Sequence, residues 1–151
     1  AKSAAALVPC FFVTGAWCGL LYMFLYLQSS AAFSEHARLK AEAKARGEKP
    51  PRLASVKYSR DGVTAPGVLQ MDRTVANYLE QSLPILIGLY MHAFLVSPNS
   101  AAVAGWLWLF CRSYYPVAWA APLPGIFMST IPAYGCVVYL WWTALSAASS
   151  L

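Results

Sequence analysis

RTVANYLEQSLPILIGLYMHAFLVSP, residues 73–98, is the segment from which the architecture follows. It opens with Arg73, Asn77 and Glu80, whose spacing places them on one face of a helix over about two turns. From residue 83 to residue 96 the segment is apolar apart from His92, and it is long enough to cross a bilayer core of about 30 Å. Because an unpaired charge facing lipid costs several kcal/mol, we expect the polar face to contact protein, a polar ligand or water at the end of a helical bundle.

The composition is that of a membrane protein. Of the 151 residues 59% are hydrophobic and 11% are charged, whereas soluble domains carry about 25% charged residues. The net charge is +5, but nine of the eleven Lys and Arg residues lie between Arg38 and Arg73. This clustering indicates a basic loop flanking a membrane, and it excludes nucleic acid as a partner.

Apolar periodicity and helix-breaking residues predict an all-α integral membrane protein, a four-helix up-and-down bundle. We expect a single membrane domain over residues 1–151. The basic loop faces the cytoplasm, stroma or matrix, and both termini lie on the opposite side. Pro50 and Pro51 end a polar extension of the first helix, and the segment from Leu53 to Asp72 is expected to be irregular. The predicted spans cover residues 4–33, 75–97, 101–120 and 126–147, with the basic loop over residues 34–72.

The cysteines favour neither a metal site nor a disulfide framework. All four lie in apolar segments, and their spacing matches no zinc motif, so we interpret them as small buried hydrophobic residues: Cys10, Cys18, Cys111 and Cys136. Gly15 and Gly19 have the spacing that lets another helix approach closely.

The predicted fold brings polar groups of two helices to one membrane face. A short turn joins the second and third spans, so Arg73, Asn77 and Glu80 are expected near Arg112 and Tyr115. Such a set suits a small zwitterionic or anionic ligand, whose carboxylates pair with Arg and whose ammonium pairs with Glu. The alternative is an internal network that links the two helices, with Glu80 paired to Arg73 or Arg112.

These residues resemble a known family. Arg73-x-x-x-Asn77-x-x-Glu80, followed in the next helix by Arg112-x-x-Tyr115, is similar to the motifs of the membrane-associated proteins in eicosanoid and glutathione metabolism, the MAPEG family. The resemblance implies a four-helix bundle, usually a homotrimer, that holds glutathione between subunits through these five residues. It also implies that Arg38 corresponds to a further glutathione-contacting arginine.

One departure from the family pattern bears on catalysis. Catalytic members have a further arginine after the third-helix motif that stabilises the glutathione thiolate, whereas no charged residue follows Arg112 here. A free thiol has a pKa of about 8.5 and is mostly protonated at neutral pH without such help. The catalytic residues therefore stay unassigned.

His92 has two interpretations. A neutral imidazole in a dry bundle suits axial ligation of a haem iron or a chlorophyll magnesium, and it equally suits a hydrogen bond to a neighbouring helix. Six aromatic residues are interpreted as an interfacial aromatic belt, although they could also stack against bound lipid or pigment: Tyr22, Tyr26, Trp106, Trp108, Trp141 and Trp142.

Two functions follow from these expectations. The first is a non-catalytic accessory subunit with an incomplete glutathione site, in a photosynthetic or respiratory membrane complex, with lipids and other membrane subunits as partners. The second is a glutathione-dependent transferase or peroxidase acting on lipophilic substrates. Because the sequence starts at Ala1 without methionine, we favour a thylakoid or mitochondrial inner membrane over the endoplasmic reticulum.

Overall fold

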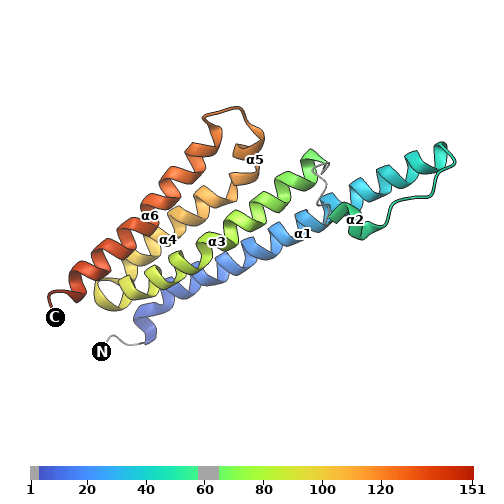
Figure 1. The fold of residues 1–151 in the computed structure, drawn as a ribbon. Coiled ribbons are helices and arrows are strands. Elements are labelled where there is room, and N and C mark those ends of the chain that lie inside the picture. The colour runs from blue at the N-terminus through green and yellow to red at the C-terminus, as the bar shows by residue number, and fades with distance from the viewer. Residues whose placement is uncertain (1–3, 58–64) are drawn as a thin grey trace. The chain divides into compact units, whose positions relative to one another are not determined.

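The computed structural model describes residues 4–57 and 65–151, and in these ranges every regular element is helical (Figure 1). The all-α class predicted from the sequence is confirmed for this part of the chain. The elements are η1 (Ala4–Leu7), α1 (Val8–Ala45), α2 (Leu53–Lys57), α3 (Pro66–Leu95), α4 (Pro98–Ser113), α5 (Tyr115–Ala120) and α6 (Gly125–Ala148).

The chain divides into two compact units, and each is described here by itself. Unit 1 contains the chain up to Leu21 together with Asn77–Leu151, and unit 2 contains Tyr22–Ala76. The single membrane domain over residues 1–151 stays a prediction.

The first helix is longer than its predicted span. It continues to Ala45, as the Ala-, Lys- and Glu-rich sequence after Ser34 indicates, and it stops where Gly47 adopts a φ of +70°. In that left-handed conformation the Glu48 N–H donates to the Ala43 carbonyl oxygen over 2.8 Å, which satisfies one of the last carbonyl groups of the helix.

The prediction that the segment from Leu53 to Asp72 is irregular is largely wrong. Part of it forms α2, and α3 begins already at Pro66, while residues 58–64 lie outside the described residues. Three apolar side chains at helical spacing explain the early start, since Val68, Met71 and Val75 are all buried.

The helix predicted over residues 101–120 is broken. It starts earlier, at Pro98, after Ser97 caps its first turn, and it ends at Ser113, with α5 beginning at Tyr115. Pro116 explains the break, because proline has no N–H to donate to the Arg112 carbonyl and its ring collides with that carbonyl in a continuous helix.

In unit 1, parts of α1 and α3 pack with α4, α5 and α6 (Figure 1). The Tyr78 hydroxyl donates to the Trp17 carbonyl oxygen over 2.9 Å, and this bond joins α3 to α1. Trp141 Nε1 donates to the Pro84 carbonyl oxygen over 2.9 Å and joins α6 to α3. Unit 1 is thus held together by hydrogen bonds from large aromatic side chains as well as by apolar packing.

Close helix approach occurs at a glycine that the sequence analysis did not identify. A Cβ atom at Gly105 would lie 2.6 Å from a methyl carbon of Val13, so α4 and α1 can meet at this distance only with glycine there. Gly15 and Gly19, the predicted contact pair, have no atom within 4 Å of a Cβ added at either position. Within the described chain they therefore mediate no helix contact.

Two of the described helices are long and apolar enough to cross a membrane, over Ala4–Ala45 and Gly125–Ala148. The first half of α3 carries Asp72, Arg73 and Glu80, and α4 has only 16 residues, which span about 24 Å at about 1.5 Å per residue. The four-span count stays a prediction.

We expect protease added outside sealed, uniformly oriented vesicles to cut either the basic loop or the N-terminal end but not both, because the four-span topology places them on opposite sides. Within unit 1 the start of α1, the turn between α3 and α4 and the end of α6 lie at one end, since Cys10 Sγ donates to the Pro98 carbonyl oxygen and His92 contacts Thr143 (Figure 1). Peptides are identified by mass spectrometry. Cleavage of both sites from the same side would contradict the four-span topology.

Candidate functional site

Arg112 is the centre of the candidate site, and it is buried inside unit 1. It lies in the last turn of α4 with only 1% of its surface exposed. Its Nη1 donates to Asn77 Oδ1 over 2.8 Å, and its Nη2 donates to Gln81 Oε1. Asn77 and Gln81 are one turn apart on α3, so the fork of the guanidinium links α4 to one face of α3.

Aromatic rings flank the guanidinium. Its central carbon lies 5.8 Å from the ring centroid of Trp108, one turn earlier on α4, and 5.5 Å from that of Tyr115 at the start of α5. Trp108 in turn packs against Tyr78 at a centroid distance of 5.2 Å. A cation–π contact contributes about 0.5–1 kcal/mol at an exposed site and about 2 kcal/mol when it is desolvated.

Hydrogen-bond donors outnumber acceptors around Arg112. Arg112 Nε, Gln81 Nε2 and Trp108 Nε1 are all buried, and no acceptor among the described residues reaches them. Nor does any carboxylate of residues 4–57 or 65–151 form an ion pair with Arg112. Burying an unpaired cation costs several kcal/mol, so this cluster matches a group that supplies acceptor atoms or negative charge.

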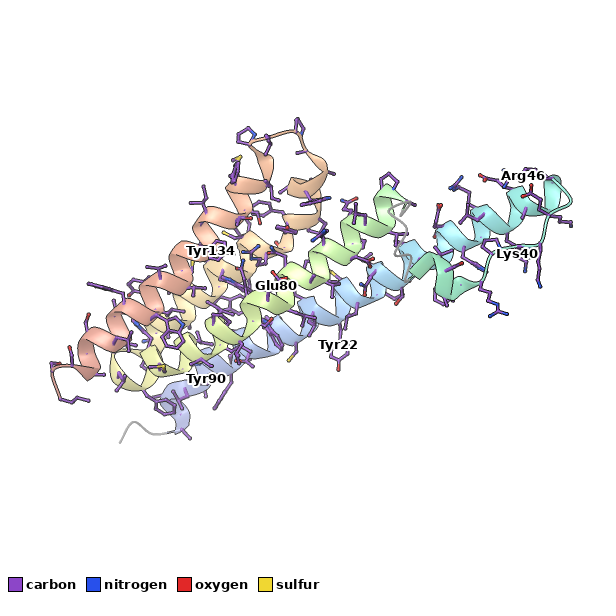
Figure 2. All side chains as sticks on the ribbon, viewed as in Figure 1. Tyr22, Lys40, Arg46, Glu80, Tyr90 and Tyr134 are labelled. Atoms are coloured by element: carbon purple, nitrogen blue, oxygen red, sulfur yellow. The ribbon has the colours of Figure 1, made fainter. Side chains whose placement is uncertain are left out.

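The structure brings together three of the residues predicted for the site. Asn77 and Arg112 are hydrogen-bonded, and Tyr115, which is 4% exposed, packs against the guanidinium. Glu80 also lies on α3 (Figure 2), but its side chain is exposed. The predicted pairing of Glu80 with Arg73 or Arg112 is wrong for the described residues, among which Glu80 forms no ion pair. Arg112 uses the amide oxygens of Asn77 and Gln81 instead.

The other two predicted arginines belong to unit 2. Arg38 Nη2 lies 2.5 Å from Glu35 Oε1, and Arg38 Nη1 pairs with Glu42 one turn further along α1. The hydrogen bond from Arg38 lowers the pKa of the Glu35 carboxyl, which shows that the two charges are coupled. Arg38 is thus balanced by carboxylates on its own helix, whereas Arg73 is exposed on α3.

Two further basic residues follow Arg38: Lys40 lies on α1 and Arg46 comes directly after its end, and both side chains are exposed (Figure 2). They belong to the predicted basic loop, which is therefore helical as far as Ala45.

His92 is completely buried near the end of α3, and both of its ring nitrogens face hydroxyl groups. Nδ1 lies 2.7 Å from Thr143 Oγ1 on α6, and Nε2 lies 2.7 Å from Ser100 Oγ on α4. This geometry favours the hydrogen-bonded interpretation over axial ligation, because a metal would have to displace one of these hydroxyls.

Two residues of the cluster were missed by the sequence analysis. Gln81 follows the motif residue Glu80 directly, and only its spacing of one helical turn from Asn77 could have indicated it. Trp108 was interpreted as part of an interfacial belt, although it lies one turn before Arg112 and is 1% exposed. Of the cysteines, Cys10, Cys111 and Cys136 are buried as predicted, but Cys18 is exposed.

Comparison with known proteins supports the resemblance seen in the motifs. No curated protein and no solved structure matches the chain. The model of the MAPEG family matches residues 13–146, which include the Asn77–Arg112 pair and most of the chain. The protein is therefore a member of the MAPEG family of integral membrane proteins.

Proposed function

We propose that this MAPEG protein is a non-catalytic membrane subunit in which the arginine of the third-helix motif has become an internal link. The observation that carries the proposal is the position of Arg112, which is 1% exposed and donates through both terminal nitrogens to Asn77 and Gln81. Both terminal nitrogens are thus directed at oxygens of α3, and Nε is the guanidinium nitrogen that has no acceptor among the described residues. The internal network expected from the sequence had Glu80 as the partner of an arginine, whereas this link joins Arg112 to the amide oxygens of Asn77 and Gln81.

The sequence after Arg112 supports the same proposal. It contains no Lys, Arg, Asp, Glu or His, so α5 and α6 supply no charge beside a bound thiol. Thiolates in proteins are stabilised by a nearby cation, a metal or a helix N-terminus, and without such help the thiol keeps a pKa of about 8.5. A bound glutathione would then remain mostly unreactive at neutral pH.

A second function, glutathione-dependent transfer or peroxide reduction on lipophilic substrates, is favoured by one observation. The unsatisfied donors of Arg112, Gln81 and Trp108 surround a positive charge that has no carboxylate partner in the described chain. A ligand carboxylate or thiolate would satisfy these donors and balance the charge. Such binding requires the Arg112 side chain to exchange one amide oxygen for the ligand.

We expect equilibrium dialysis with radiolabelled glutathione, on protein in mild detergent, to detect at most millimolar binding, which corresponds to about 4 kcal/mol. The Gln81→Leu variant frees one nitrogen of Arg112 without removing its charge, so it should bind glutathione no more weakly than the parent. Ser113→Ala serves as the matched control, since Ser113 is exposed, neighbours Arg112 and is not a predicted ligand contact.

Saturable micromolar binding by the parent would contradict the internal-link proposal. Loss of that binding in an Arg112→Gln variant that keeps its helical content would establish the second function instead.

We propose further that the protein belongs to an organellar membrane complex with other membrane subunits, lipids or pigment. Sizing in mild detergent together with an absorbance spectrum distinguishes such a complex from a homotrimer. A component of a large coloured complex supports the accessory role, whereas a small colourless homotrimer supports the transferase.

A further inference from the structure

The polar end of α1, from Ser34 to Ala45, belongs to unit 2, and one of its faces is covered by the chain that follows. His36 Nε2 donates to the Pro51 carbonyl oxygen over 3.1 Å, so the segment after the helix folds back against it. Ala43 is 3% exposed. The remaining faces of this helical end are open to a partner.

The carboxylates of residues 34–52 are all paired with arginines of the same segment. Glu35 and Glu42 both form ion pairs with Arg38. Glu48, just past the helix, lies 3.2 Å from the Nε atom of Arg46. These pairs use up the negative charge of the segment, so its lysines are not neutralised locally.

A second open face carries only lysine and alanine. Ala37, Lys40, Ala41 and Lys44 recur at the spacing of one helix face, and all four are exposed; we call them the basic face. No carboxylate of residues 4–57 or 65–151 forms an ion pair with either lysine. Because like charges one turn apart destabilise a free helix by about 0.2–0.5 kcal/mol, an anionic partner would relieve a repulsion that the helix alone does not.

The lysines lie well beyond the lipid headgroups. Gln28 Nε2 donates to Asp72 Oδ1 over 2.8 Å, and a carboxylate is too costly inside the hydrocarbon, so this pair marks its boundary. Lys40 and Lys44 follow Gln28 by about 18 and 24 Å of helix. The headgroup layer adds only about 5–8 Å. The remaining gap of about 10 Å or more exceeds the Debye length of about 8 Å at physiological salt.

Nothing in α1 bends the basic face back to the membrane. The helix has no proline or glycine from residue 20 to residue 45, and sharp kinks in helices occur mostly at such residues. A tilt of about 20°, the average for membrane helices, shortens the gap only slightly. Charge complementarity therefore favours an acidic protein over anionic lipid.

We propose that the basic face docks an acidic segment of another protein subunit, whose carboxylates lie one helical turn apart opposite Lys40 and Lys44. The short side chains of Ala37 and Ala41 let the partner come close enough to shield these ion pairs from water, which strengthens them. The inference rests on the part of the proposed function that places the protein in a complex with other subunits. It uses no residue of the Arg112 cluster.

The first test measures how fast a small amine-acetylating reagent modifies each lysine, read by mass spectrometry. We expect Lys40 and Lys44 to react at least about fivefold more slowly in native membranes than in detergent, as they would with a partner present at several times its dissociation constant. Lys49, exposed beyond the end of α1, is the internal control and should change less than about twofold. Unchanged reactivity of both basic-face lysines would overturn the proposal.

The same measurement in phosphatidylcholine vesicles, with and without phosphatidylserine, isolates the contribution of lipid. The purified protein should show the detergent rates in both. Slowing by phosphatidylserine to the extent seen in native membranes would overturn the proposal in favour of a lipid surface.

The second test identifies the partner with a carbodiimide in native membranes. The reagent activates a carboxyl group, the lysine amine displaces the activating group, and an amide bond forms with net loss of water. We expect Lys40 or Lys44 to be joined to an Asp or Glu of another polypeptide. Links only to carboxylates of this sequence, or none at either lysine, would contradict the proposal.

A pair of double variants separates charge from structure. Lys40→Glu/Lys44→Glu should leave the large complex on sizing in mild detergent, whereas Lys40→Arg/Lys44→Arg keeps the charge and should stay in it, with equal helical content in both. Equal retention of the two would count against the basic face. Tight glutathione binding would remove the proposed function without changing these readouts, whereas a large complex whose lysines stay reactive would remove this inference alone.

Discussion

Replacing Arg112 with alanine is expected to lower the free energy of unfolding by about 3 kcal/mol. The change leaves the Asn77 and Gln81 side-chain oxygens without their donor, and it opens a cavity between Trp108 and Tyr115. Removing an unpaired charge offsets part of this loss. Reversible unfolding in mixed detergent micelles, followed by circular dichroism, measures the difference.

Three companion variants separate the causes of this loss. Arg112→Met removes the charge as alanine does but fills much of the volume, so it should lose less than alanine because it leaves a smaller cavity. Arg112→Lys keeps the charge but cannot reproduce the planar fork that reaches both amides, so it should lose about as much as alanine. Ser113→Ala, at an exposed neighbouring position, should change stability by less than about 0.5 kcal/mol. An unchanged free energy of unfolding in Arg112→Ala would show that the hydrogen bonds from Arg112 to α3 contribute little to stability.

The second large effect concerns turnover. With a standard aromatic electrophile and saturating glutathione at pH 7, we expect a rate far below the 1 per second or more that is usual for enzymes. The reason is the absence of any cation after Arg112 together with the use of Arg112 itself inside the bundle. Conjugation is followed by absorbance, with heat-denatured protein as the blank.

The conjugation rate is also expected to increase with pH. An unassisted thiol of pKa about 8.5 is only about 3% ionised at pH 7, and each unit of pH below the pKa removes about nine-tenths of the remaining thiolate. Any residual rate should therefore rise about tenfold per pH unit up to about pH 8.5, in parallel with the reaction of glutathione in buffer. A rate that is already maximal at pH 7 would require a thiol pKa well below 7 and hence an activating group.

Features that depend on residue spacing or helix propensity within one segment were predicted correctly from the sequence. The spacing of Arg73, Asn77 and Glu80 placed all three on one helix, and the family motif identified Asn77 and Arg112 as neighbours. The extension of α1 past Ser34 followed from the high helix propensity of Ala, Lys and Glu.

Other features depended on tertiary packing and could not be predicted. The sequence paired Glu80 with arginine because opposite charges attract, whereas the packing of α3 against α4 presents Gln81 and leaves Glu80 exposed. It assigned close helix contact to Gly15 and Gly19 by their spacing, but only the approach of Val13 shows that Gly105 is required. Pro116 lies within the predicted span over residues 101–120, which was expected to be one continuous helix, but the proline divides it into α4 and α5.

The most direct test of the account is a difference absorbance spectrum near 240 nm, recorded when glutathione is added to the purified protein at about pH 7. If Arg112 is an internal link and no other cation serves the sulfur, glutathione in the presence of the protein will show no more thiolate than glutathione alone. A thiolate band that saturates with protein concentration, and that disappears in Arg112→Gln but persists in Ser113→Ala, would contradict the account and identify Arg112 as the activating cation.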